Sequence, residues 1–468
     1  MEKATFSKKK VAGLVIAVLL IAASFLMPES EQLTRAGITA LAVLLGAVVL
    51  WITETFPAGV TGFLAITVMV LFGVAPVSAA FSGMGSSSVA FTIAVFSLTI
   101  ILMNSNLGLL LTGLLLKWAK SDSKRLVLAF MMASAILSSI MSNLAVSATF
   151  MGIAYTILNA LGAKPGKSNF GKCLMLGIPI AAINGGMGTP AGGSLNIVAL
   201  GLMEQMTGKT ISFLDWTLIG FPLMLVMTPI CWFFIVKLLK PEQINPDGLH
   251  DINRRISEIR TLSAADKKVI FFIVAMPVLW ILGNWIPVLN VTVVSILGMA
   301  LMFLPGIELL HWDDFQRHVP WNIVLMMGSV ISLGSIVGST GGTAFLANFF
   351  LESGVVNLNS YVVLFLMGAF AYYLHTILPV GPAILTLFYI PMLGICEGAG
   401  ISAAIPTLML SFILSGNYLL PVNPNLMVTY STGYYSSKDV LLSGAIPSVI
   451  FLLLFTFWAP FMAGVIGI

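Results

Sequence analysis

Apolar stretches long enough to cross a lipid bilayer as helices recur along the chain from Val11 to Ile466. They leave no segment long enough for a separate soluble domain. One of them, about 88–116, carries Asn104-Ser105-Asn106 near its middle. The spans that the pattern predicts are 11–27, 36–53, 58–75, about 88–116, 213–236, 269–286, 290–305, 321–340 and 440–466.

Two further apolar segments, 173–203 and 405–432, are interrupted by small and polar residues. The first contains the run Gly185 to Gly193, and the second contains the run Ser415 to Asn425. Because an interior glycine costs a helix about 1 kcal/mol and a proline about 3 kcal/mol, we expect both helices to break. At membrane depth, a break is tolerated only where the freed backbone faces protein or a water-filled cavity, so it usually marks a binding site. The alternative is a glycine-rich packing seam.

Each broken helix follows an apolar segment that we expect to form a re-entrant hairpin. The segment 126–161 has lysines on both flanks, so it should enter and leave on one side, with Ser142-Asn143 at its tip. The segment 356–392 contains a second interrupted run, from His375 to Ala383. This order predicts an all-α polytopic membrane protein with about 11 transmembrane helices plus two re-entrant hairpins in an inverted repeat, and a site near the midplane.

The repeat divides the chain into two halves, 1–240 and 269–468, joined by a polar stretch. This stretch, 241–268, is amphipathic and carries Arg254, Arg255 and Arg260. A cytoplasmic, interfacial linker helix explains it better than a nucleic-acid-binding patch does. We therefore expect no nucleic-acid partner.

Charge and composition place the protein in a membrane and orient it. With 58% hydrophobic residues, 9% charged residues and a mean hydropathy of +1.03, the chain cannot be an ordinary soluble protein. Most of the 22 Lys and Arg residues fall on one side of the threaded chain, and only Arg35 and Lys209 fall opposite. The positive-inside rule then predicts a multi-pass protein of the cytoplasmic membrane with its N-terminus inside.

The predicted spans lack the side chains that proton relays use. No Asp or Glu lies at the centre of a span, and His375 is the only histidine within a hairpin or span. Hydroxyls, amides and backbone groups at the tips and breaks instead suit an anion, with sodium as a companion. His375 is either a structural residue bonded to a backbone carbonyl or a group that helps to hold the anion. Enzyme motifs such as H-E-x-x-H and the P-loop are absent.

Several motifs together resemble one transporter family. They are Trp51-Ile52-Thr53-Glu54-x-x-Pro57, the first hairpin tip, Gly185-Gly186-Met187-Gly188-Thr189-Pro190 with Asn196, and Leu420-Pro421 with Pro424-Asn425. In this order and spacing the chain resembles the divalent anion/sodium symporter family over nearly its whole length. That family includes bacterial dicarboxylate carriers and animal sodium-coupled citrate, dicarboxylate and sulfate carriers.

The resemblance implies particular site residues. A first sodium site would consist of Ser138, Ser142, Asn143 and a carbonyl near Gly188. Substrate contacts would come from both halves of the chain: Asn143, Leu144, Thr189, Asn196, Gly381, Pro382, Ala383, Pro421 and Asn425.

The chain also departs from the family pattern. Leu144 stands where the family usually has Thr, and Gly381-Pro382-Ala383 falls where Ser-Asn-Thr is expected. Ile377 falls where a sodium-binding Thr is usual. These departures weaken the expectation of a second sodium site and of symmetric binding of two carboxylates.

The sequence therefore predicts a secondary active transporter, not an enzyme. The expected substrate is a small divalent organic anion of the C4-dicarboxylate type, carried by Na+-coupled symport through an elevator-type movement in a homodimer, as the resemblance implies. The alternatives are a Na+-independent anion exchanger, a carrier for sulfate, a sulfonate or a monocarboxylate, and a membrane sensor or channel-like protein that carries nothing.

Overall fold

The computed structural model describes residues 7–30, 33–119, 122–244, 262–352, 358–378, 380–415, 417–421 and 423–468. Every regular element among these residues is a helix, which confirms the all-α class. Most of the predicted linker, including Arg254, Arg255 and Arg260, lies outside the described residues.

The helices follow the predicted order. The first half contains α1 (Lys8–Ser24), α2 (Arg35–Ile52), α3 (Ala58–Leu71), α4 (Val77–Ala80), η1 (Ser82–Gly85), α5 (Ser87–Met103), α6 (Leu107–Ala119), α7 (Ser123–Ser138), α8 (Asn143–Ala160), α9 (Asn169–Gly186), η2 (Pro190–Gly192), α10 (Ser194–Thr207) and α11 (Phe213–Leu239). The second half contains α13 (Ala264–Leu282), η3 (Pro287–Leu289), α14 (Val291–Met302), α15 (Trp312–His318), α16 (Trp321–Ser339), α17 (Gly342–Glu352), α18 (Ser360–Ile377), α19 (Gly381–Gly398), α20 (Ala404–Ser415), α21 (Pro424–Tyr430) and α22 (Ser437–Ile466).

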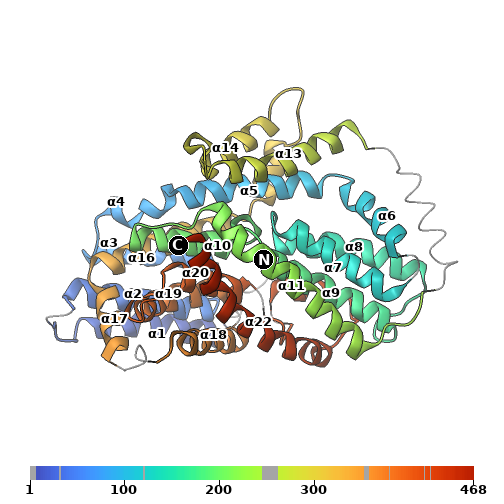
Figure 1. Ribbon diagram of the computed structural model, residues 1–468. Coiled ribbons are helices and arrows are strands. Elements are labelled where there is room, and N and C mark those ends of the chain that lie inside the picture. Colours follow the sequence, from blue (N-terminus) through green and yellow to red (C-terminus); the bar gives the residue numbers. More distant parts are fainter. Residues whose placement is uncertain are drawn as a thin grey trace.

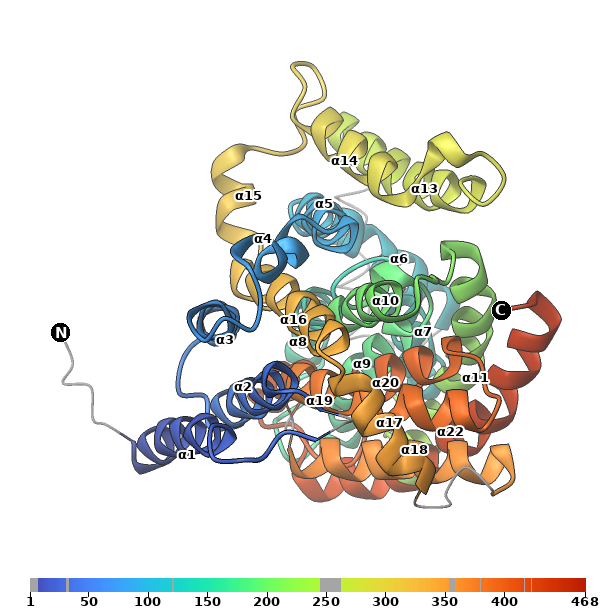
Figure 2. The same ribbon diagram turned by 90° about the vertical axis from the view of Figure 1, so that its left-hand side faces the viewer.

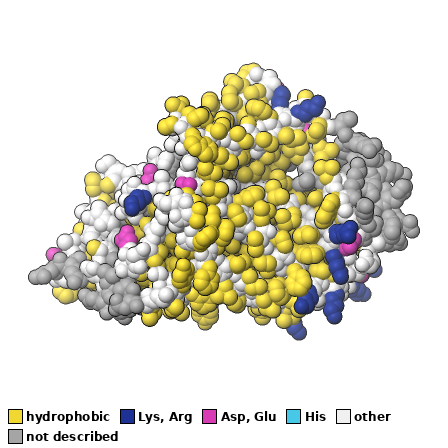
Figure 3. Space-filling view, viewed as in Figure 1, with side chains coloured by type: hydrophobic (Ala, Val, Ile, Leu, Met, Phe, Trp, Pro, Cys, Tyr) yellow, Lys and Arg dark blue, Asp and Glu magenta, His cyan; other side chains and the backbone are white. Residues whose placement is uncertain are grey.

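The exterior suits a bilayer. Among the described residues, seven helices are long and apolar enough to cross one, and α3, α5, α14 and α20 are shorter apolar helices. Figure 3 shows hydrophobic side chains over the middle of one face and charged side chains toward its two ends. In Figure 2, many helices are seen end-on: α13 and α14 lie at one edge, and α8, α9, α10 and α16 lie inside.

Both predicted hairpins are present. Helices α7 and α8 form the first, and α18 and α19 form the second. In Figure 1 the first lies in the right-hand half of the molecule and the second in the left-hand half. The two hairpins thus approach the centre from opposite ends, as an inverted repeat requires.

Both predicted breaks are present as well, although the first begins later than expected. Helix α9 continues through Gly185 and Gly186, and the chain then forms η2 before α10 begins. A Cβ atom on Gly185 would overlap the Ala135 carbonyl of α7, so this glycine allows two helices to approach closely. The second break separates α20 from α21.

Two features differ from the prediction. The expected single span at 88–116 is wrong, because the chain breaks at Asn104-Ser105-Asn106 between α5 and α6. The buried carboxylate of Asp266 accepts a hydrogen bond of 3.0 Å from the Asn106 amide, which satisfies a group that the break frees. In addition, α17 was not predicted; it follows a turn at Gly341, whose φ of +83° suits glycine.

Candidate functional site

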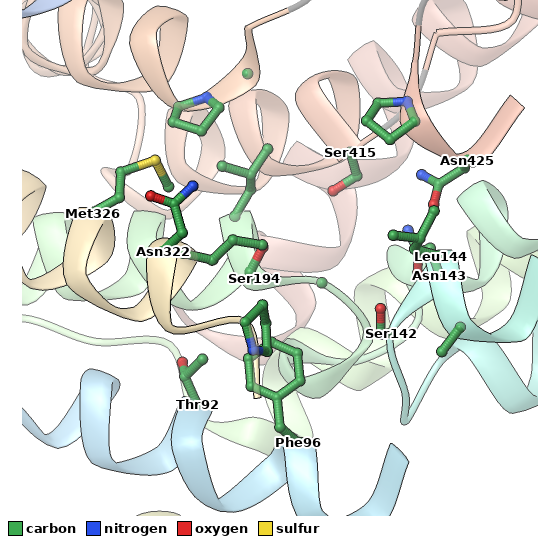
Figure 4. A pocket seen from close by; sticks show the side chains of 18 of the residues that line it. Thr92, Phe96, Ser142, Asn143, Leu144, Ser194, Asn322, Met326, Ser415 and Asn425 are labelled. Carbon is green, nitrogen blue, oxygen red and sulfur yellow. The ribbon is translucent and has the colours of Figure 1, made fainter. Parts of the chain in front are cut away.

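A cavity of about 840 Å³ lies between the two hairpin tips. Residues at the starts of α8, α10 and α19 line one part of it, and residues of α5 and α16 line the opposite wall. Figure 4 shows Asn322 and Met326 of α16 on one side, and Asn143 and Asn425 on the other. The cavity also reaches the loop between α2 and α3, where Glu54 is exposed.

Five helices with starts that line the cavity begin without a capping side chain: α3, α8, α10, α16 and α19. The N-cap residues of α8, α10 and α19 are Ser142, Gly193 and Val380, and none accepts a side-chain hydrogen bond from its helix. By contrast, α2, α5, α7, α9, α11, α13, α14, α18, α21 and α22 each have a side chain that caps their first turn. Of these cap residues, Asn423 of α21 lines the cavity.

Uncapped helix starts leave amide donors that point out of the helix, together with the positive end of the helix dipole. Within the described part of the chain, the amides of Asn143, Leu144 and Ala145 donate no hydrogen bond. Among the described residues that line the cavity there is no Lys or Arg. The positive potential available to an anion therefore comes mainly from backbone amides.

The Asn143 side chain joins this donor set. Its Oδ1 accepts a hydrogen bond of 2.7 Å from the Ser138 hydroxyl. Its Nδ2 has no partner among the described residues, although Asn143 is only 8% exposed and lines the cavity. One end of this carboxamide is thus held in the protein, and the other is free to bind a ligand.

Neutral oxygen atoms gather directly behind the first tip. A Cβ atom on Gly192 would lie 2.9 Å from the Gly186 carbonyl oxygen and 3.0 Å from that of Ser138. Both carbonyls therefore lie close to Gly192, and the Gly186 carbonyl also accepts a hydrogen bond of 2.7 Å from Asn196. Neutral oxygens of this kind suit sodium, and the predicted first site, with Ser138, Ser142, Asn143 and a carbonyl near Gly188, stays a prediction. Gly188 packs against Ser139 at its edge.

Two predicted substrate residues lie behind the cavity wall instead of on it. Asn196 is fully buried and donates hydrogen bonds of 2.7 and 3.1 Å to the carbonyls of Gly186 and Thr189. Thr189 donates through its hydroxyl to the Ser139 carbonyl. Both side chains hold the unwound segment in shape.

The second tip offers less polar chemistry to the cavity. Gly381 and Pro382 line it, whereas Ala383 and Pro421 do not. Asn425 lines it beside the first tip, because α21 packs against α8 and α9. Of the predicted substrate residues, the cavity thus brings together Asn143, Leu144, Gly381, Pro382 and Asn425.

A buried polar network behind the second break was not predicted. The Tyr418 hydroxyl donates to Asn184 Oδ1, and the Tyr418 amide donates to the Tyr372 hydroxyl at 3.0 Å. The Asn184 amide group faces Thr228 at 3.4 Å. Tyr418 lies within the second interrupted run and Asn184 directly before the first, so their place at the breaks was the signal that could have pointed to them. The network ties α9 and α11 to the second break.

Two further cavity residues were also missed: Asn322 on the opposite wall and Ser194 at the start of α10. Asn322 stands at the start of α16 and accepts a hydrogen bond of 2.7 Å from the Gly59 amide. Ser194 begins α10 and lines the cavity. Nothing in the sequence brings these positions together, since they depend on how distant helices pack.

Comparison with known proteins assigns this chain to a family. A family profile described as the sodium:sulfate symporter transmembrane region matches residues 8–464. A protein of Cupriavidus necator named "Membrane protein" is 24% identical over 473 residues, which cover 95% of this chain and 92% of that protein. The sodium-dependent dicarboxylate transporter SdcS of Staphylococcus saprophyticus is 24% identical over 472 residues, covering 94% of this chain and 88% of that protein.

Two solved structures share the fold. MtrF of Neisseria gonorrhoeae, whose structure is described as illuminating a class of antimetabolite efflux pumps, has a TM-score of 0.57 and 13% identity, with 98% of this chain and 95% of that chain covered. The YdaH transporter of Alcanivorax borkumensis has a TM-score of 0.55 and 10% identity, with 98% of both chains covered. Both neighbours are membrane transporters, and the likeness concerns the fold.

Proposed function

Because the chain belongs to the sodium:sulfate symporter family, a family of transporters and not of enzymes, we propose that it carries a small organic anion across the cytoplasmic membrane together with sodium. The family assignment agrees with the resemblance that the sequence motifs indicate. The C4-dicarboxylate size of the substrate is part of the proposal and follows the name of the SdcS relatives.

One observation carries the proposal: the uncapped starts of α8, α10 and α19 lie at a cavity whose described lining contains no Lys or Arg. Each helix N-terminus is equivalent to roughly half a positive charge. An anion is held there by hydrogen bonds from amides that are already oriented, so binding costs little reorganisation.

Sodium would bind near the Ser138 and Gly186 carbonyls, next to the Ser138 hydroxyl and Asn143 Oδ1. The carboxamide of Asn143 would then touch the cation with its oxygen and the anion with its nitrogen. Coupling follows from this shared side chain, because an ordered Asn143 is a better ligand for both. The first half of the chain supplies this site, and the number of sodium ions is proposed to be one.

An elevator-type movement fits the division of the cavity walls. In this proposal the hairpins and broken helices move together past α5, α16 and the loop between α2 and α3. The cavity reaches that loop, which the positive-inside prediction places on the cytoplasmic side. The structure would then be the inward-open state. The cytoplasmic N-terminus and the homodimer belong to the same proposal.

Uptake into proteoliposomes tests the function. Purified protein would be supplied with succinate, other small carboxylates, sulfonates and sulfate, under an inward gradient of either sodium or choline. Sodium-driven accumulation of at least one anion is expected. Uptake that ignores sodium but requires anion inside the vesicles would instead identify an exchanger. Binding without accumulation would identify a sensor, and conductance far above carrier turnover would identify a channel.

A further inference from the structure

A second hollow lies at the outer edge of the molecule, away from the substrate cavity. It has a volume of about 350 Å³ and lies between the first half of α13 and the end of α14 with the loop that follows. Figure 2 shows α13 and α14 together at one edge of the molecule. The wall of the hollow consists of two lysines and four apolar side chains: Lys267, Lys268, Phe271, Phe272, Leu301 and Ile307. The hollow therefore offers both positive charge and an apolar surface to a ligand.

Helix α13 presents one face to the protein and the opposite face to the outside. Its buried residues are spaced three or four apart: Asp266, Val269, Phe272, Met276 and Trp280. The opposite stripe starts with the exposed Lys267. It continues at the same spacing with Phe271, Val274 and Val278, which are 65%, 57% and 48% exposed. In a protein that spans a bilayer such a stripe faces lipid, so Lys267 stands at the polar end of a lipid-facing surface.

Lys268 is fixed at the rim of the hollow. Its Nζ donates hydrogen bonds of 2.5 and 3.2 Å to the carbonyls of Gly306 and Ile307. These bonds hold the loop after α14 against the start of α13. Because an ammonium group has three donor hydrogens, one of them is still available to a ligand.

The acidic groups near the hollow do not pair with these lysines. Asp266 precedes them, but its buried carboxylate accepts hydrogen bonds from the Ser263 hydroxyl and the Asn106 amide. Glu308 follows the hollow along the chain and is exposed. In the part of the chain that the structure describes, neither lysine forms an ion pair. The two ammonium groups thus present positive charge beside an apolar surface.

We infer that this hollow binds one anionic phospholipid, with its phosphate between Lys267 and Lys268 and an acyl chain along Phe271 and the outer face of α13. A zwitterionic phospholipid has the same acyl chains, but its headgroup has no net charge to attract the lysines. The positive-inside prediction places this end of α13 on the cytoplasmic side, where basic pockets between transmembrane helices bind anionic headgroups. The lipid site is separate from the substrate cavity and goes beyond the proposed transport function.

Phosphatidylglycerol and phosphatidylcholine with identical acyl chains form a matched pair of probes, because the first is anionic and the second zwitterionic. Purified protein in detergent would be titrated with each lipid, and the rise in melting temperature would give the affinity. We expect phosphatidylglycerol to bind roughly 10- to 25-fold more tightly, since each lysine near an anionic headgroup contributes about fivefold. Inorganic phosphate alone should have no effect, because it gains nothing from the apolar wall.

The variant K267Q removes one charge from an exposed position, so it should fold as the parent does. It should bind phosphatidylglycerol about fivefold more weakly and phosphatidylcholine as before. The matched control is K9Q, because Lys9 is also exposed and lies on the same predicted side, but at the start of α1 and outside the hollow. This control should leave both affinities unchanged. Melting temperatures without lipid show whether each variant folds.

The other possible results overturn the inference. Equal affinities for the two lipids, or equal losses in K267Q and K9Q, would exclude a specific anionic-lipid site. A rise in melting temperature with inorganic phosphate alone would identify a free-anion site. If no lipid has an effect and F271A converts a dimer to a monomer in size-exclusion chromatography, a second copy of the chain covers the hollow instead. None of these measurements uses a transported anion, so their failure is distinct from failure of the proposed function.

Discussion

The substitution G186A tests whether Asn143 couples sodium to the anion. A Cβ atom on Gly186 would lie 2.5 Å from Asn143 Nδ2 and 2.9 Å from its Oδ1. Both contacts involve the end of a flexible side chain, so we expect Asn143 to swing aside and the protein to fold. The change therefore disturbs the site without removing any of its residues.

The expected size of the effect follows from what Asn143 loses. Its hydrogen bond of 2.7 Å with Ser138 breaks, and its oxygen leaves the space where sodium would bind. One interaction with a charged group contributes about 1.5 to 3 kcal/mol. The sodium concentration for half-maximal uptake should thus rise roughly 10- to 100-fold, with a parallel loss of anion affinity.

Uptake into proteoliposomes over a series of sodium concentrations measures this effect. The matched control is G152A on α8, where an added Cβ meets nothing within 4 Å. It should transport normally and be as stable as the parent or more stable by up to about 1 kcal/mol, because alanine favours a helix over glycine. Unchanged sodium dependence in G186A would refute a sodium site at Asn143.

Three further predictions concern stability in detergent. N196A should lower the melting temperature, at a cost of about 2 kcal/mol, since the buried Gly186 carbonyl is left without a donor in the described chain and the Thr189 carbonyl keeps only the Gly192 amide. Y418F should cost about 1 kcal/mol, because Asn184 loses its hydrogen bond, and thermal unfolding would show it. Burial raises the pKa of Asp266, but hydrogen bonds from Ser263 and Asn106 outweigh it and hold that pKa below its usual range. Its stabilisation is therefore present above pH about 4 and lost as the pH falls through the lower, folded-state pKa, and a pH series of melting temperatures should show this loss in the parent protein but not in D266N.

Hydropathy and glycine content were enough to predict the hairpins and both broken helices. The first hairpin was recognisable because lysines flank both of its ends, and the second because its apolar segment is interrupted between His375 and Ala383. The breaks were recognisable because glycine and proline destabilise a helix. The exact start of the first break was not predictable. It depends on Gly185 and Gly186 packing against α7 and α8, which no local pattern encodes.

The break between α5 and α6 shows a different limit. Asn104, Ser105 and Asn106 are individually tolerated in a helix, so the segment was predicted as one span. The partner that stabilises the break is Asp266, which is 160 residues away along the chain. A contact between residues this far apart forms only in the tertiary structure, so it cannot be predicted from local sequence patterns.

The candidate site was predicted in part for the same reason. Asn143, Leu144, Gly381, Pro382 and Asn425 line the cavity, because family motifs mark the tips that meet there. Asn196 and Thr189 belong to the same motifs, but their side chains donate hydrogen bonds to backbone carbonyls instead of lining the cavity. The opposite wall, with Asn322 and Met326, comes from α16, and its position facing the tips depends on how distant helices pack.

The uncapped starts of α8, α10 and α19 affect how this protein can be studied and how it can diverge. Recognition that resides in the main chain survives almost any exchange of side chains, so alanine scanning would detect few of the groups that hold the cargo. Proline is the substitution that removes such a group, and position Ser194 could accept it because Gly193 before it is extended. Distant members of the lineage can therefore differ in most side chains around the chamber and still grip an anion in the same way.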